Sequence, residues 1–194
     1  MLKKYSLSYT AASLRRNESQ TLAREFANTP DWDELRRRSV SEDLLMIRQE
    51  SSRKRVTAEL IKRLKNLTPA ELNTLATTDD ARVAEALAWL AICRTYEFVA
   101  EFTVHVAGAR WHAGITTLGE GAYEEFRAQQ AELHPELDSL SEQTSARLRS
   151  QLFTIMREMG FLLKDGSLVP YQFPPAAASV ICDEDVAFFP TAVS

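Results

Sequence analysis

Four cations in one short run of the chain have the residue type and the spacing to bind phosphate groups. With residues placed about 100° apart around a helix, they share an arc of about 100°: Lys54, Arg55, Lys62 and Lys65. Ala58 lies among them in that arc, which contains no acid. Lysine and arginine bind phosphate by charge-assisted hydrogen bonds, and a small residue among them permits close approach to a nucleic-acid backbone. The run therefore predicts a nucleic-acid contact; the competing interpretation is a solvated helix face.

The helix that carries these cations must turn its other side toward a hydrophobic core. We predict that it spans residues 51–67, and its aliphatic side chains fall opposite the cations: Val56, Leu60, Ile61, Leu64 and Leu67. Short helices predicted over residues 31–39 and 41–48 precede it. This order favours a helix-turn-helix with residues 51–67 as the recognition helix. Arg48 and Arg53, at its start, are further predicted DNA-binding residues.

The positive charge is concentrated in the first third of the chain. Residues 1–67 contain 15 Lys/Arg and 9 Asp/Glu, whereas residues 68–194 contain 8 and 18, which together give the net charge of −4. Three consecutive arginines at residues 36–38 belong to the positive third and extend the predicted contact surface. This asymmetry predicts a polyanionic partner for the first third.

A second helix, predicted over residues 142–159, is another candidate for DNA contact. Ser141 caps its start, and its apolar stripe predicts that Arg147 and Arg157 face outward. The residues that follow carry Asp-Gly between apolar runs, which predicts a short β-hairpin with Lys164 at its tip. A helix followed directly by a hairpin is typical of a winged helix, so these three cations are predicted to touch bases or phosphates. The alternative is a helix with a structural role alone.

The composition, rich in helix formers and with 6 Gly and 7 Pro, predicts an all-α protein. We expect one compact helical globule over residues 1–194, with an N-terminal helix-turn-helix and a C-terminal winged-helix-like element. Its core contains one long helix from residue 81 to about residue 110. The predicted segments are a loosely docked arm over 1–16, a basic helix-turn-helix-like segment over 18–67, a central helical core over 68–135, a winged-helix-like segment over 136–175 and a C-terminal tail over 176–194.

Residue patterns argue against an enzyme, a metal site or a membrane protein. The three histidines lack metal-ligand spacing, and the two cysteines add no ligand pair. We find no P-loop, dinucleotide-binding turn or nucleophile elbow. The apolar stretch 83–107 carries several charged side chains, each of which costs about 2.5–3.5 kcal/mol at a bilayer centre. We therefore expect a cytoplasmic, monomeric protein without catalytic activity or cofactor.

Three stretches carry a family resemblance, in the same order along the chain: residues 44–64 (LLMIRQESSRKRVTAELIKRL), 87–102 (LAWLAICRTYEFVAEF) and 133–162 (LHPELDSLSEQTSARLRSQLFTIMREMGFL). They resemble the BrxA family, a core component of the bacteriophage exclusion (BREX) systems that protect bacteria from phages. The resemblance implies an all-α fold with helix-turn-helix elements and binding to double-stranded DNA. It also implies partners in the same defence system: a DNA methyltransferase, an ATPase, a phosphatase-like protein and a Lon-like protein.

The residues and the resemblance together predict a non-catalytic, double-stranded DNA-binding accessory protein of a BREX system. Binding would depend mainly on phosphate contacts, with limited sequence readout. Two alternatives stay open. One is an adaptor that assembles other BREX proteins through the acidic two-thirds of the chain, and the other is RNA binding through the basic helix.

Overall fold

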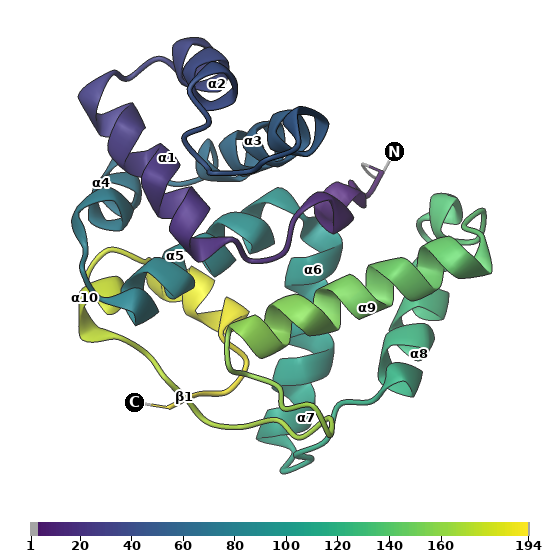
Figure 1. The fold of residues 1–194 in the computed structure, drawn as a ribbon. Coiled ribbons are helices and arrows are strands. Elements are labelled where there is room, and N and C mark those ends of the chain that lie inside the picture. Colours follow the sequence, from purple (N-terminus) through teal and green to yellow (C-terminus); the bar gives the residue numbers. More distant parts are fainter. Residues whose placement is uncertain (1–3, 194) are drawn as a thin grey trace. The chain divides into compact units, whose positions relative to one another are not determined.

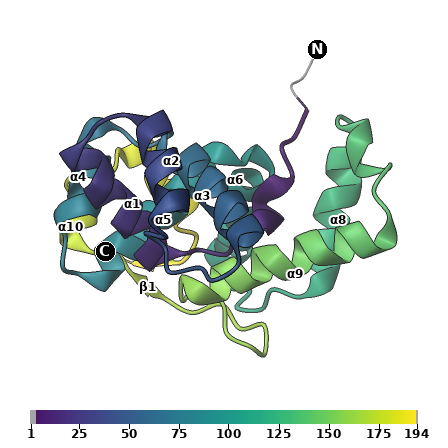
Figure 2. The same ribbon diagram turned by 45° about the horizontal axis from the view of Figure 1, so that its top comes forward.

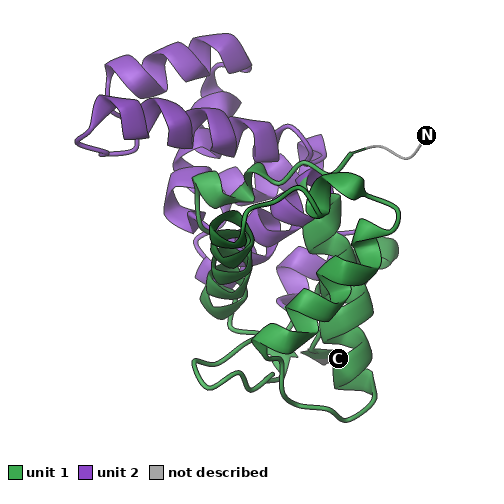
Figure 3. Cartoon of the chain, turned by 90° about the vertical axis from the view of Figure 1, so that its right-hand side faces the viewer, with its two compact units in different colours: residues 1–13, 96–173, 183–194 green, residues 14–95, 174–182 purple. Residues whose placement is uncertain are grey.

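The computed structural model describes residues 4–193, and the contacts of the chain divide it into two compact units (Figure 3). Unit 1 comprises residues 1–13, 96–173 and 183–194, and unit 2 comprises residues 14–95 and 174–182. The all-helical class predicted from composition is confirmed, and short strand pairings are confined to unit 1 within the described chain.

Unit 2 is a cluster of helices around α1 (Figure 1). Its helices are α1 (Arg16–Asn28), α2 (Trp32–Ser41), α3 (Glu50–Leu64), α4 (Pro69–Thr77), α5 (Ala81–Thr95) and α10 (Pro175–Ala178). α1 contacts each of α2 to α5, and α10 packs on α5. Fully buried apolar side chains from three helices, Leu22, Leu60 and Trp89, belong to the core of this unit.

The helix starts of unit 2 follow the capping pattern of the sequence. Asp31 accepts hydrogen bonds from the backbone N–H groups of the first turn of α2, at 2.8 and 3.0 Å. Thr68 and Glu71, which have the spacing of a capping box in the sequence, form one at the start of α4. The buried Glu71 carboxylate also accepts two hydrogen bonds from the Arg94 guanidinium, at 2.6 and 2.8 Å. One side chain thus caps α4 and joins it to α5.

The short helix predicted over residues 41–48 is wrong, because a loop connects α2 to α3. Asp43 and Met46 in this loop have left-handed backbone conformations, with φ of 51° and 52°, which an α-helix does not contain. The Asp43 carboxylate accepts the Ile47 N–H at 2.8 Å. Side-chain contacts therefore hold the backbone in a form that apolar periodicity does not reveal.

Unit 1 contains the longest helix of the described chain, α9, which is drawn in green in Figure 2. The helices of unit 1 are η1 (Ser8–Ala11), α6 (Glu97–Phe102), the π-helix η2 (Thr103–Gly108), α7 (Ala109–His112), α8 (Glu120–Ala131), η3 (Pro135–Leu137), α9 (Glu142–Glu158) and η4 (Asp183–Phe188). Two short strands, β1 (Tyr171–Gln172) and β2 (Ala192–Val193), pair in parallel.

The described part of the N-terminal arm that belongs to unit 1, residues 4–13, is docked firmly and not loosely as the sequence predicts; residues 1–3 of the predicted arm lie outside the described residues. Tyr9 is fully buried, and η1 contacts α9. The Tyr5 hydroxyl donates to Glu101 at 2.6 Å, and the Tyr5 ring stacks on His134 with centroids 3.8 Å apart. Aromatic side chains provide this anchorage, which the polar composition of the arm does not suggest.

The hairpin predicted after the second candidate helix is present, whereas a winged-helix role for this segment stays a prediction. Gly160 directly follows the last turn of α9 with φ 79°, a left-handed conformation that glycine adopts without strain. A hairpin follows, in which Leu162 and Leu168 form an antiparallel bridge. Its turn is closed by the Ser167 N–H, which donates to the Asp165 carboxylate at 2.9 Å.

The single helix predicted from residue 81 to about residue 110 is wrong. α5 ends at Thr95, and Tyr96 leaves the helical conformation with φ −126° and ψ 92°. No glycine or proline marks this break in the sequence. The Tyr96 ring is fully buried and lies edge-on to Tyr9, with centroids 5.7 Å apart. Packing within unit 1 therefore outweighs the helical preference of the local sequence.

Candidate nucleic-acid interface

α3 presents its cationic face to solvent, as its helical spacing predicts. The four cations and the alanine among them are all exposed: Lys54, Arg55, Ala58, Lys62 and Lys65. The aliphatic side chains opposite are buried: Val56, Leu60, Ile61, Leu64 and Leu67. The predicted orientation of this helix, with the aliphatic side inward and the cationic side outward, is thereby confirmed.

Lys54, at the N-terminal end of this face, pairs with a carboxylate on its own helix. Its Nζ lies 2.6 Å from Glu50 Oε1, and the two side chains are 62% and 61% exposed. The hydrogen bond from Lys54 lowers the pKa of Glu50. Solvent screens such an exposed pair, which contributes little to stability, so a phosphate can replace the carboxylate at small cost. Arg55, one residue on, has no carboxylate at ion-pair distance within residues 4–193.

Lys65, at the other end of the face, lies beside an aromatic pair on α1 and α2. Its Nζ is 5.9 Å from the ring centroid of Trp32. The Trp32 ring stacks on Phe26, with centroids 3.8 Å apart. A cation at this distance from an indole face is attracted by the ring quadrupole, so the ammonium group is steered toward this edge of unit 2.

Arg53 supports the loop that precedes α3. Its side chain is 15% exposed, and its Nη1 lies 2.9 Å from the Asp43 carboxylate. The hydrogen bond from Arg53 lowers the pKa of Asp43, and the same guanidinium nitrogen donates to the Ile47 carbonyl at 3.3 Å. A phosphate contact by Arg53 therefore stays a prediction. Arg48, in the same loop, is exposed.

α3 also contains a buried ion pair that the sequence reasoning missed. Arg63 Nε lies 2.6 Å from Glu59 Oε1, and the two side chains are 2% and 5% exposed. Their spacing of four residues is the available sequence signal, although that spacing is equally common on exposed faces. A buried charge is costly without its partner, so the pair constrains the rotation of α3 about its axis.

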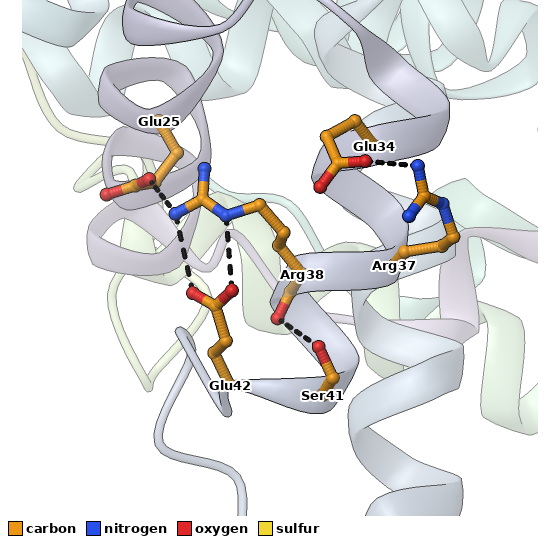
Figure 4. A network of polar contacts seen from close by, with 6 residues as sticks. All are labelled: Glu25, Glu34, Arg37, Arg38, Ser41 and Glu42. Carbon is orange, nitrogen blue, oxygen red and sulfur yellow. Dashed lines mark hydrogen bonds and ion pairs between the residues drawn. The ribbon is translucent and has the colours of Figure 1, made fainter.

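The three arginines of α2 have different surroundings, two of which are drawn in Figure 4. Arg38 pairs with Glu25 at 2.9 Å and with Glu42 at 3.3 Å, and so joins α1 to the end of α2. Arg37 pairs with a glutamate one turn earlier on its own helix. Arg36 is exposed and has no ion-pair partner in the described chain. Of the three, Arg36 and Arg37 are available to a ligand.

A groove of about 840 Å³ separates α2 from the first turns of α3. Four cations line it, Arg36, Arg37, Arg53 and Lys54, together with one carboxylate, that of Glu50. The cationic face of α3 therefore continues across the groove onto α2, and this continuity depends on tertiary packing. An extended positive surface of this kind suits a chain of phosphates better than a single anion.

The cations predicted in the last third of the chain belong to unit 1. Arg147 and Arg157 are exposed on α9, while the apolar stripe of that helix is buried. The Arg157 guanidinium lies 6.0 Å from the Phe153 ring centroid. Lys164 is exposed in the turn of the hairpin. Their contact with DNA stays a prediction.

Among residues 4–193, no group of three or more His, Cys, Asp or Glu residues has an arrangement that could hold a metal ion. Every helix in that range is too short or too polar to cross a membrane.

The sequence matches a known protein family, and the fold is similar to a solved structure. The BrxA family model matches residues 3–185. The crystal structure of an uncharacterized protein from Magnetospirillum magneticum is similar, with a TM-score of 0.82 over 97% of this chain and 98% of that one. The sequence identity to that protein is 16%, so the similarity concerns the fold alone. No curated protein gives a significant match to the chain.

Proposed function

Because the chain belongs to the BrxA family of BREX phage-defence proteins, we propose that it is a non-catalytic protein that binds double-stranded DNA within that defence. The observation that carries the proposal is the exposed face of α3, where four cations surround Ala58. The other BREX components are the partners that family membership suggests.

The shape of this face suits a duplex. An α-helix fits the major groove, which is about 12 Å wide, and the small side chain of Ala58 lets the helix axis approach the backbone. The cations of α3 would contact phosphates. Arg36 and Arg37, which lie across the protein groove between α2 and α3, would contact the adjoining DNA backbone. Three of the four cations on the α3 face are lysines, which bind phosphate as point charges and read bases less often than arginine does. We therefore expect strong salt dependence and limited sequence preference.

The first test is the salt dependence of binding to a labelled 20–30-base-pair duplex, measured by fluorescence anisotropy. With about four to six phosphates neutralised, log affinity should fall with log salt concentration at a slope of ~−4 to −5. The double variant Lys54→Glu/Arg55→Glu should lose binding while its circular dichroism spectrum stays helical. Affinity that does not change with salt would contradict the electrostatic basis of the proposal.

A matched control is Arg82→Glu, compared with the single variant Arg55→Glu. Arg82 is exposed in the first turn of α5, within the same unit but on another helix. Both variants change the charge equally, so Arg82→Glu should bind far better than Arg55→Glu. If Arg147→Glu/Arg157→Glu weakens binding more than Lys54→Glu/Arg55→Glu does, the element that meets DNA is α9 and not α3. Competition with duplex RNA of the same sequence distinguishes DNA binding from RNA binding.

A further inference from the structure

The loop between α2 and α3 exposes one large apolar side chain almost completely. Met46 is 91% exposed, compared with 61% for Leu133, 47% for Leu163 and 43% for Ile115, the other exposed large apolar residues of the described chain. Its neighbour Leu45 is buried, at 7%. The loop therefore anchors one apolar side chain in unit 2 and projects the next into solvent.

The backbone on both sides of Met46 is held by specific contacts. The Met46 N–H donates to the Asp43 carbonyl at 2.9 Å, and the Ile47 N–H donates to the Asp43 carboxylate at 2.8 Å. The Arg53 guanidinium bridges that carboxylate and the Ile47 carbonyl, at 2.9 and 3.3 Å. Met46 thus lies in a loop that hydrogen bonds and an ion pair hold in place. One of the residues that hold it, Arg53, belongs to α3.

This arrangement works against the stability of the isolated protein. A left-handed conformation is sterically unfavourable for a non-glycine residue, and Met46 has φ 52°. The exposed thioether side chain gains nothing from burial to offset that cost. Strained residues that the surrounding structure holds in place are concentrated at functional sites. Met46 is therefore a candidate for contact with a ligand.

The charges around Met46 indicate what that ligand is. Arg48 is exposed two residues further along the chain, and the cationic face of α3 starts at Lys54, within the first turns of the following helix. The carboxylates of the same stretch are paired within unit 2: Glu42 with Arg38, Asp43 with Arg53 and Glu50 with Lys54. An apolar side chain followed along the chain by exposed cations matches a partner that is anionic outside and apolar inside. A DNA duplex has this character, with phosphates on its surface and stacked bases within.

We propose that Met46 is a wedge that enters a base-pair step of the bound duplex and partly unstacks it. The proposal rests on the DNA binding proposed above, and it adds that binding deforms the DNA. Methionine is among the apolar side chains that architectural proteins insert between bases, with kinks of roughly 20–90°. The neighbouring phosphate contacts would offset the cost of unstacking.

The test compares wild type with Met46→Gly and Met46→Leu on a relaxed closed-circular plasmid treated with topoisomerase I. Wedge insertion unwinds DNA, so saturating wild-type protein should shift the topoisomer distribution, and Met46→Leu should shift it similarly. Met46→Gly, which removes the wedge and relieves the left-handed strain, should lose the shift. It should fold normally and keep the salt slope of wild type in the anisotropy assay.

The outcomes separate the two proposals. If wild-type protein does not bind duplex DNA at all, both the proposed function and the wedge are wrong. If wild type binds with the expected salt slope and Met46→Gly unwinds the plasmid as well as wild type does, the wedge alone is wrong. Loss of binding to another BREX protein in Met46→Gly, with unwinding unchanged, would likewise overturn the wedge and assign the side chain to a protein contact.

Discussion

Replacing Ala58 by glutamate tests the proposed interface at its centre. Ala58 is exposed on α3 and lies one turn from Lys54, Arg55 and Lys62. A carboxylate at this position would compete with phosphate for these cations and would meet the approaching backbone with like charge. The perturbation is local, because the native side chain is a single methyl group at the surface.

The size of the effect follows from counting phosphate contacts. Each phosphate contact changes the slope of log affinity against log salt concentration by about 0.9. Lowering the salt concentration from 1 M to 0.1 M therefore raises affinity roughly tenfold for each contact. If the new carboxylate removes two contacts, the slope becomes shallower by about 2 and affinity at 0.1 M salt falls roughly 100-fold. Folding should not suffer, because glutamate favours helices and its pairing with Lys62 contributes about 0.2–0.5 kcal/mol.

The assay is fluorescence anisotropy of a labelled duplex, measured at salt concentrations from about 50 to about 300 mM, over which phosphate contacts make affinity strongly salt-dependent. The control is Ala58→Gln. Glutamine has nearly the shape of glutamate without its charge. Ala58→Gln should therefore reduce affinity by much less than Ala58→Glu and leave the slope close to that of wild type. Wild-type affinity and slope in Ala58→Glu would show that DNA does not meet this face. Equal loss in both variants would show that close approach, and not charge, dominates.

Three further predictions concern stability, and urea denaturation checks each. Arg63→Met should lower the free energy of unfolding by about 3–5 kcal/mol, because it removes a charged partner of the buried Glu59 carboxylate; a loss below about 1 kcal/mol would show that the pair is dispensable. Thr68→Ala should cost about 1 kcal/mol through loss of the α4 cap, whereas Thr68→Ser should be nearly neutral. Hydrogen bonds from the backbone N–H groups of Glu34 and Asp33 lower the pKa of Asp31 below its ordinary value. Its contribution to stability is therefore present above the unfolded-state pKa of about 4 and is lost as the pH falls through the lower folded-state value. Asp31→Asn should flatten this part of the stability profile, and an unchanged profile would contradict the assignment.

Local signals predicted several elements correctly because the interactions that form them lie within a few residues. Asp31, Thr68 and Ser141 cap helices through the first turn that follows each of them. Gly160 ends α9 as its position after an amphipathic stripe indicates. The orientation of α3 followed from the alternation of aliphatic and cationic residues around one helix, which is itself a local property.

Local sequence signals did not predict the loop between α2 and α3. Apolar residues in the segment 44–47 continue a helical periodicity, but Asp43 and Met46 are left-handed. That conformation is supported by Arg53, a residue of α3 whose guanidinium pairs with Asp43 in the loop. The sequence therefore predicted the α3 face, with the arginines at residues 36–38 as its extension, but not the groove that α2 and α3 form by packing together.

What the chain determines by itself is the helical class, the caps and which side of α3 carries charge, because each depends on residues that are neighbours within one or two turns. What tertiary structure alone decided is the break at Tyr96, the burial of Glu59 with Arg63 and the docking of Tyr5. Each of these requires a side chain in an environment that other helices create. The free energy of burying a ring or an ion pair depends on that surrounding packing, and no local pattern encodes it.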